Sequence, residues 1–282
     1  MSGGLWRDAV RQLKTDRLAL VSLAILALLG GAAVAGPWLL DYREDEIDWA
    51  NMAAPPLAAD GHWLGTDRLG RDLLVRTLFG LRVSMAIALA ATLISLVIGV
   101  GWGALAGYLR GGADALMMRF VDVLYSLPQV FFVIILTVVF GRGPLPLLAA
   151  IGAFGWLTMA RIVRGQAQSL REREFVEAAV VGGAGTLRIV ARHIVPNLLG
   201  PVIVFATLTV PQVILVESFL SFLGIGIQEP LASLGNLIAD GAVEMETAPW
   251  ILAVPAGCLV LLVFCFNFLG DGLRDALDPR DR

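Results

Sequence analysis

The chain has 282 residues, of which 57% are hydrophobic and only 16% are charged, and its mean hydropathy is +0.78. This composition is far too apolar for a soluble domain of that length and indicates a protein that lies in a lipid bilayer. The formal net charge of -3 at pH 7 excludes a basic face large enough to bind nucleic acid.

Six stretches without a charged residue are long enough to cross a bilayer as helices. We therefore expect an all-α, polytopic membrane protein with six transmembrane helices, at residues 18–40, 83–109, 123–141, 143–160, 194–216 and 247–270. The first stretch follows basic residues, as in a signal peptide. It is too long for one and lacks a convincing cleavage site, so we expect a retained helix.

The basic residues are divided unequally between the two sides that these spans would create. Fifteen lie in the N-terminal arm 1–17, the 110–119 turn, the 161–192 loop and the C-terminal tail, and six lie on the opposite side. Because positively charged loops stay in the cytoplasm, both termini and the long fourth loop are predicted to be cytoplasmic. The resulting plan is an arm, a transmembrane domain at 18–270, and a tail at 271–282 in which Pro279 stops the last helix.

Two segments on the outer side are long enough to have structure of their own. In the first, 41–82, Thr66 or Asp67 is placed to cap a helix whose leucines gather on one side, which predicts an interfacial helix. The second, 228–246, has four acidic residues and no basic residue. We expect it to be an exposed outer loop or a partly re-entrant one.

The second span carries glycines at every fourth position: Gly99, Gly103 and Gly107. On a helix these residues form one bare stripe, which lets the backbone of another helix approach closely. That second helix belongs either to this chain or to a partner subunit.

No pattern typical of a catalytic or metal site is present in the sequence. His62 and His193 fall on opposite sides of the bilayer, so they cannot share a metal, and each is interpreted as a surface or interfacial residue. The phosphate-binding pattern G-x-x-x-x-G-K-[ST] is absent, so ATP is expected to bind a partner. Cys258 and Cys265 would lie about 10 Å apart on a helix, beyond the reach of a disulfide.

Three charged residues lie near the ends of the spans. Arg119 and Asp122 are three residues apart, a spacing that predicts a local helical ion pair. Glu217 is about 20 residues past the inner end of the fifth span, which places it near the outer surface. We favour an interfacial position for Glu217 over a place in the substrate path.

The cytoplasmic loop 161–193 contains a short helical pattern. The residues that recur on one face have small or smooth side chains: Phe175, Ala178, Ala179 and Gly182. Gly183 then allows a sharp turn. Such a face fits a groove in a partner, whereas a helix that lies on lipid usually has larger apolar residues and many lysines. The residues alone allow either a docking helix or a solvated loop.

The same loop resembles the EAA signature of permease subunits from binding-protein-dependent ABC importers. The matching residues are Glu177, Ala178, Ala179, Gly183, Ile194 and Pro196. The resemblance implies a type I ABC importer transmembrane domain whose coupling helix fits into a cleft of a separate ATPase subunit. Phe175 and Gly182 belong to the same predicted coupling surface.

Other motifs extend the resemblance over nearly the whole chain. The outer-loop residues Gly65, Thr66, Asp67, Gly70, Arg71 and Asp72 are similar to a motif of the peptide and nickel branch of these importers. The runs 192–197, 217–224 and 228–231 look most like the C subunit of oligopeptide permeases. Leu234 departs from the family pattern, which often has tryptophan there, in a loop that the resemblance places against the binding protein.

The resemblance implies a permease subunit of an ATP-driven importer that moves oligopeptides across the bacterial cytoplasmic membrane by alternating access. Its implied partners are a second homologous permease subunit, two ATP-binding subunits that hold ATP and magnesium, and an extracytoplasmic substrate-binding protein. The chain itself is expected to bind no cofactor and to have no catalytic residue; its substrate-binding residues are not identified. A dipeptide, nickel or glutathione permease shares the same motifs. An autonomous channel or a membrane enzyme is the alternative from another class.

Overall fold

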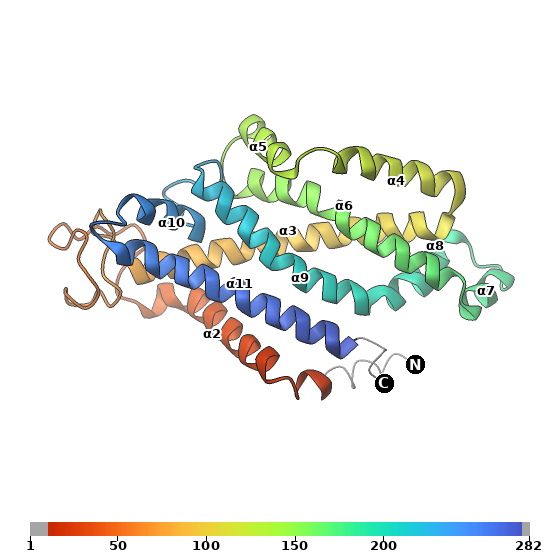
Figure 1. Cartoon of the computed structure of the whole chain (residues 1–282), viewed down its shortest axis with the longest axis horizontal. Helices are drawn as coiled ribbons and strands as arrows, with labels where there is room; N and C mark the ends of the chain where they lie inside the picture. Colours follow the sequence, from red (N-terminus) through yellow and green to blue (C-terminus); the bar gives the residue numbers. More distant parts are fainter. Residues whose placement is uncertain (1–10, 278–282) are drawn as a thin grey trace.

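The computed structural model describes residues 11–277, and long helices lie side by side along the long axis of the molecule (Figure 1). The elements are α2 (Arg17–Leu39), α3 (Leu73–Leu109), α4 (Gly111–Tyr125), α5 (Gln129–Phe140), α6 (Pro144–Arg171), α7 (Glu174–Val181), α8 (Thr186–Ile189), the π-helix η1 (Val190–Ile194), α9 (Val195–Phe222), α10 (Leu234–Val243) and α11 (Pro249–Leu277). We call the end that carries the 40–72 segment and α10 the loop end, and the opposite one the α7 end. The start of the expected N-terminal arm and the expected stop at Pro279 lie outside the described residues.

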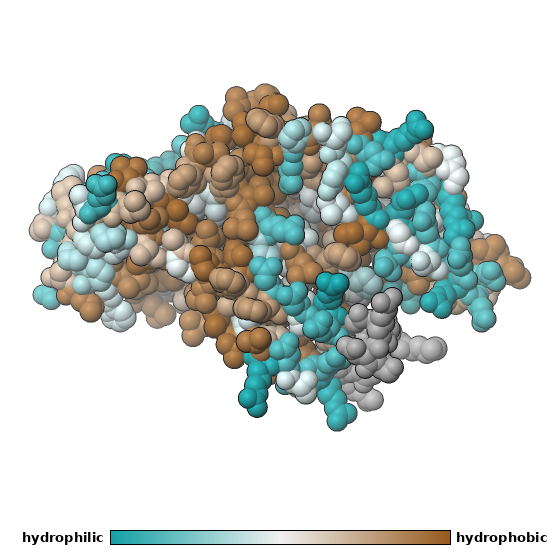
Figure 2. All heavy atoms as spheres, in the orientation of Figure 1, coloured by the Kyte–Doolittle hydropathy of each residue, from teal (hydrophilic) through white to brown (hydrophobic). Residues whose placement is uncertain are grey.

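Hydrophobic residues cover the middle of the molecule, and hydrophilic residues gather toward the α7 end, with a mixed group at the loop end (Figure 2). Within residues 11–277, five helical stretches are long and apolar enough to cross a membrane: α2, α3, α6, the stretch from α8 to α9, and α11. The pair α4 and α5 makes a sixth span if it is counted as one crossing bent by 79°.

The predicted continuous span at 123–141 is therefore wrong, because the helix breaks between Tyr125 and Gln129. Pro128 explains the break, since it disfavours helical geometry at Leu127 and has no N–H to continue the hydrogen-bond ladder. The helix resumes directly after this proline.

The predicted separate interfacial helix in the 41–82 segment is also wrong. One helix, α3, runs unbroken from Leu73 to Leu109, so residues 73–82 form its first turns and only the segment before them is a loop. Asp72 caps this helix, because its side chain accepts a hydrogen bond from the backbone N–H of Val75 at 2.8 Å. Neither Thr66 nor Asp67 is the cap.

The glycine stripe of α3 lies against α6 of the same chain. A methyl group on Gly103 would lie 2.4 Å from the carbonyl oxygen of Ala160, and one on Gly107 would lie 2.5 Å from that of Arg164. At Gly99 the nearest atom would be a side-chain carbon of Met159, at 2.6 Å. The two helix backbones can approach this closely only because all three positions lack a side chain.

Four hydrophobic clusters hold the described helices together, and the smallest packs Phe79 of α3 against Leu237 of α10. The largest joins buried residues of α2, α3, α5, α6, α9, α10 and α11. A second lies toward the α7 end and connects α3, α6, α7, η1 and α9, and a third packs α4 against α3 and α6. The bent α4–α5 segment and the short α7 are thus both attached to the central pair α3 and α6.

Candidate functional site

Helix α7 is attached to the bundle mainly through the side chain of Val176, with Ala179 packed against the same cluster. Val176 is only 1% exposed and belongs to the hydrophobic cluster at the α7 end, which also contains Ile189 and Ile194. The helix follows α6 after a break of two residues, Glu172 and Arg173. Movement of α7 would therefore be transmitted to the bundle both by this direct connection and by the packing around Val176.

Most of the predicted docking face of α7 is exposed, but Ala179 packs against the same cluster as Val176. The side chains of Phe175, Glu177 and Ala178 are exposed, that of Ala179 is half-buried, and Gly182 is exposed. The surface beside this face is also apolar, with exposed Val180, Val181 and Leu187. A small and partly apolar surface at the tip of the molecule is suited to a partner that covers it.

Gly183 ends α7 in a conformation that favours glycine. Its φ angle is +77°, and its N–H donates to the carbonyl oxygen of Val180 at 2.9 Å. The N–H of Ala184 reaches back to the carbonyl oxygen of Ala179 at 3.0 Å, so the last carbonyls of α7 have partners. The sharp turn expected after the helix is present.

The two remaining signature residues lie in different surroundings. Ile194 has no exposed surface and packs in the same cluster as Val176, whereas Pro196 is exposed in the first turn of α9. The structure thus brings the signature together at one end of the molecule but divides it between an exposed helix and its buried support.

Ion pairs connect α4 to α6 near this end. Asp122 accepts a hydrogen bond from Arg161 Nη2 at 2.7 Å, and the Arg161 guanidinium lies 4.0 Å from the centre of the Tyr125 ring. The predicted local pair between Arg119 and Asp122 is therefore wrong, because a cation on the neighbouring helix pairs with the carboxylate instead.

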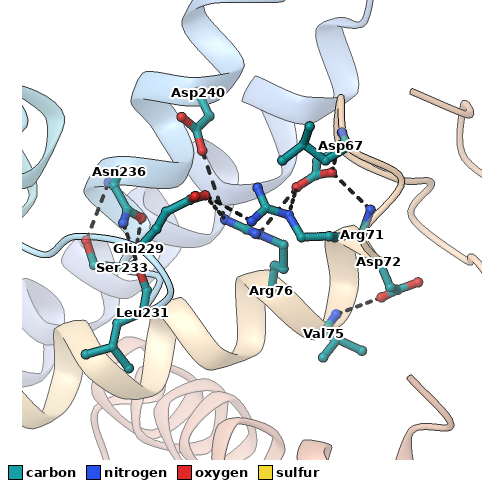
Figure 3. Close-up of polar contacts among 11 residues, drawn as sticks. Asp67, Arg71, Asp72, Val75, Arg76, Glu229, Leu231, Ser233, Asn236 and Asp240 are labelled. Atoms are coloured by element: carbon teal, nitrogen blue, oxygen red, sulfur yellow. Dashed lines mark hydrogen bonds and ion pairs between the residues drawn. The ribbon is translucent and has the colours of Figure 1, made fainter. Parts of the chain in front are cut away.

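A second cluster of polar residues lies at the loop end (Figure 3). The Arg71 guanidinium donates to Asp67 at 2.7 Å through Nε and to Glu229 at 2.9 Å through Nη1. Arg76 lies beside it with 2% exposure, 3.5 Å from Asp67, 3.7 Å from Glu229 and 4.0 Å from Asp240. Two buried arginines thus connect the first outer segment to the second.

The outer-loop motif also shapes the backbone of its own segment. Gly65 and Gly70 have φ angles of +80° and +81°, and a methyl group at either one would collide with a backbone oxygen. The Thr66 hydroxyl accepts from the N–H of Ala54 at 2.8 Å. Within the motif, Asp72 both caps α3 and contacts His62 Nδ1 at 2.8 Å.

His62 is buried, contrary to the predicted surface position. Its side chain is 1% exposed, and its ring stacks on that of Tyr42 with 4.3 Å between the ring centres. The carboxylates of Asp48 and Asp72 lie on either side of the imidazole. His62 therefore holds the 40–72 segment together.

The acidic residues of the cluster differ in their electrostatic surroundings. The hydrogen bond from Arg71 lowers the pKa of Glu229 below its ordinary value, despite a smaller opposing effect of burial. Burial raises the pKa of Asp240, and the nearby Arg76 offsets only part of that increase. Compared with Asp240, Glu229 is thus the stronger anionic partner for Arg71 and Arg76.

Glu217 lies in the interior and not at the interface. It has no exposed surface, and its two carboxyl oxygens accept hydrogen bonds at 2.8 Å from Ser84 on α3 and Ser221 on α9. The Ser84 hydroxyl in turn accepts from the N–H of Leu234, at 3.2 Å. The prediction of an interfacial position is wrong, because α10 folds back over α3 and α9 and covers the carboxylate.

The second outer segment is more ordered than the exposed loop that we expected. Helix α10 occupies its centre and starts with a capping box, in which Ser233 and Asn236 bond to each other's backbone N–H. The Leu234 side chain is fully buried. The leucine that this chain has in place of the family's frequent tryptophan therefore affects packing inside the protein.

A cavity of about 420 Å³ lies halfway along the bundle, between α3, α6, α9 and the break in α4–α5. Two of its lining residues, Thr92 and Ser95, are buried and have hydroxyls without a hydrogen-bond partner among the described residues. Neither residue was predicted from the sequence. The available signal was the presence of two hydroxyl residues three positions apart, on one face of the second predicted span.

Two family models match this chain, one over its N-terminal part and one over the remainder from residue 99. The family model described as binding-protein-dependent transport system inner membrane component matches residues 99–282. A second model, described as the N-terminal TM domain of oligopeptide transport permease C, matches residues 4–56.

Individual relatives are similar over nearly their full length. The oligopeptide transport system permease protein OppC of Escherichia coli is 53% identical over 99% of this chain and 92% of its own length. The protein of the same name from Haemophilus influenzae is 51% identical, over 99% and 89%. The dipeptide transport system permease protein DppC of Bacillus subtilis is 45% identical, over 98% and 86%.

A solved structure shares the fold. A chain of the inward-facing methionine ABC transporter MetNI aligns with 72% of this chain and 96% of its own, with a TM-score of 0.56 and 21% sequence identity. This similarity concerns the arrangement of helices alone.

Proposed function

Because the chain belongs to the family of binding-protein-dependent transport system inner membrane components, we propose that it is the permease subunit of an oligopeptide importer. It lies in a bacterial cytoplasmic membrane, with the α7 end in the cytoplasm. The excess of basic residues in the segments at that end supports this orientation. Both termini are then cytoplasmic.

The chain works with partners. A second permease subunit completes the pathway, two ATP-binding subunits hold ATP and magnesium, and a substrate-binding protein delivers the peptide at the loop end. ATP binding and hydrolysis in the partner subunits supply the free-energy difference between outward-open and inward-open states. The chain itself performs no covalent chemistry.

The observation that carries this proposal is the attachment of α7. Val176 anchors the helix while Phe175, Glu177 and Ala178 stay exposed, so a partner can hold the outer face without displacing the anchor. A force on α7 is passed to α6 through the chain and to η1 and α9 through the cluster around Val176. This is the arrangement that a coupling helix needs.

At the loop end, the surface offered to the binding protein is formed around the 40–72 segment and α10. Leu234 is buried, so it acts on such a contact only through the position of α10. The exposed aromatic residues Trp49 and Trp63 are better placed to touch a partner.

The coupling role is tested by substitutions at α7 in the complete transporter. Glu177→Lys reverses an exposed charge, and Gly183→Asp strains a backbone at φ +77°. We expect both variants to insert into the membrane but to lose ATPase association and peptide uptake. The matched controls are Glu246→Lys, an exposed residue at the loop end, and Gly185→Asp, where the backbone has an ordinary φ of -71°. Unchanged association in the two α7 variants would refute the role.

A dipeptide importer is the second candidate, because the DppC protein of Bacillus subtilis is 45% identical to this chain. Uptake measured with peptides of two to five residues, delivered by the cognate binding protein, separates the two candidates. Uptake limited to dipeptides would favour the second one.

A further inference from the structure

The cavity in the middle of the bundle has hydrogen-bonding groups that no part of the described chain uses. Thr92 is 6% exposed and Ser95 2% exposed, and neither hydroxyl has a partner among residues 11–277. Ser and Thr in a helix commonly bond to the carbonyl oxygen four residues earlier, so two unpartnered hydroxyls on neighbouring turns are unusual. Leaving a buried hydroxyl unpaired costs free energy, which a ligand in the cavity would recover.

The broken span opens onto the same cavity. Four residues at the point where α4 ends and α5 begins form part of its wall: Tyr125, Leu127, Pro128 and Gln129. Irregular backbone at membrane depth is tolerated where it is buried in protein or lines a water-filled cavity. Helix α5 starts there without a side-chain cap, so the N–H groups of its first turn lack both a capping side chain and partners within the helix.

The remaining polar residues of the wall are neutral. They are Tyr125, Gln129, Thr158, Thr209 and Gln212, and none of the lining residues within the described chain is charged. A wall without charge cannot compensate the desolvation of an ion. It suits a neutral ligand that both donates and accepts hydrogen bonds. The volume of about 420 Å³ is within the range of roughly 300–1,000 Å³ typical of ligand sites.

We propose that this cavity holds main-chain amide groups of the peptide during its passage, with Thr92 and Ser95 as hydrogen-bonding residues. A peptide main chain is a neutral donor and acceptor whatever its side chains are, so these contacts would bind peptides of varied sequence. This inference rests on the proposed function and names the part of the chain that touches the substrate.

The test uses the complete transporter in proteoliposomes, with a reporter cysteine in the cavity wall. The native cysteines are replaced by Cys258→Ser and Cys265→Ala, and Thr158→Cys places a thiol at an exposed position of the wall. Peptide uptake by this background is measured first. The probe is N-acetyl-trialanine amide, a neutral polyamide, and the readout is the concentration that halves the rate of thiol labelling.

We expect the double substitution Thr92→Val and Ser95→Ala to raise that concentration roughly tenfold, because each lost hydrogen bond weakens binding by about two- to tenfold. The control is Thr77→Val, which removes another buried and unpartnered hydroxyl of α3 that is not part of the cavity. It should leave the protecting concentration unchanged. The same peptide with N-methylated amides should protect the reporter thiol poorly in the parent transporter, which carries only the cysteine substitutions.

The inference is overturned if the double variant is protected as well as its parent, if Thr77→Val causes the same shift, or if N-methylation has no effect. A transporter with wild-type sequence that takes up no peptide would instead reject the proposed function, and this inference with it.

Discussion

Arg164 on α6 donates two hydrogen bonds to Asp114 on α4, from Nε at 2.6 Å and from Nη2 at 2.7 Å. The two nitrogens face the two carboxyl oxygens, so the pair is bidentate, and the Asp114 side chain is only 7% exposed. Gln168 adds a third contact at 3.2 Å. Because α6 is followed by α7 after only Glu172 and Arg173, this pair connects the α4–α5 segment to the helix that directly precedes α7.

Removal of this pair should destabilise the protein more than removal of its exposed neighbour. We expect Asp114→Ala to lower the free energy of unfolding by about 1–3 kcal/mol, because it removes a mostly buried, charge-assisted contact. Asp122→Ala removes the exposed pair with Arg161 and should cost less than about 1 kcal/mol. Thermal unfolding of the purified protein in detergent measures both. Equal shifts in the two variants would contradict the expectation.

The carboxyl group of Glu217 should be replaceable by an amide but not by a methyl group. Glu217→Gln keeps a polar group beside Ser84 and Ser221, and we expect it to fold with a loss of no more than about 1 kcal/mol. Glu217→Ala leaves both serine hydroxyls without that acceptor and opens a cavity, so it should cost about 3 kcal/mol or more. The midpoints of thermal unfolding distinguish the two variants. A glutamine variant as unstable as the alanine variant would show that a carboxyl group is required.

Two glycines two residues apart on α3 should respond oppositely to alanine. At Gly103 the added methyl group meets the Ala160 carbonyl oxygen, so α3 and α6 must separate, at a cost of about 1–3 kcal/mol. At Gly101 no atom lies within 4 Å, and alanine should be neutral or stabilising by about 0.5–1 kcal/mol. Expression level and thermal stability of Gly103→Ala and Gly101→Ala check this difference. Similar behaviour of the two variants would show that the close contact of α3 and α6 does not limit stability.

The contribution of Glu229 to stability should depend on pH. Its pKa is lower in the folded protein than in the unfolded chain because Arg71 bonds to the carboxylate. Its contribution is therefore fully present above the unfolded pKa, near about 4.3, and is lost as the pH falls through the folded pKa. We expect wild type to unfold at a higher temperature than Glu229→Gln at pH 7, and this difference to disappear on acidification.

A control for that experiment is Glu246→Gln, an exposed residue of the same outer segment that makes no ion pair within the described chain. It should match wild type at every pH. The raised pKa of Asp240 acts in the opposite direction, since burial penalises its ionised form, so the substitution at Glu229 is needed to isolate its contribution. If the difference in unfolding temperature between wild type and Glu229→Gln persists at low pH, its cause is not the ionised carboxylate.

Much of the fold is encoded in short stretches of the chain. Hydropathy located the membrane-crossing helices because each one must satisfy its backbone hydrogen bonds internally and expose apolar side chains to lipid. The break at Pro128 was also encoded locally, and the proline was a signal that we did not use. The start of α3 was misplaced because Thr66, Asp67 and Asp72 are all suitable caps, and only the folded loop assigns each of them its partner.

The candidate site was predictable to different degrees at its two ends. The period of small residues around Glu177 predicted α7, since a face of that kind follows from side chains within two helical turns. The cluster at the loop end was not predictable, because Arg71 and Glu229 are 158 positions apart in the chain. The buried position of Glu217 was likewise hidden, since α10 covers it from another part of the sequence.

The sequence by itself determined that this protein lies in a membrane, which segments are long and apolar enough to cross it apart from the broken pair α4 and α5, and which family it resembles. These properties depend on composition and on residues close together in the chain. Tertiary structure alone decided which carboxylates meet which arginines, that the glycine stripe of α3 contacts α6, and that Thr92 and Ser95 line the same cavity as the break between α4 and α5. The physical reason is that burial, ion pairing and cavity formation depend on helices far apart in the chain, whose contacts arise only when the bundle packs.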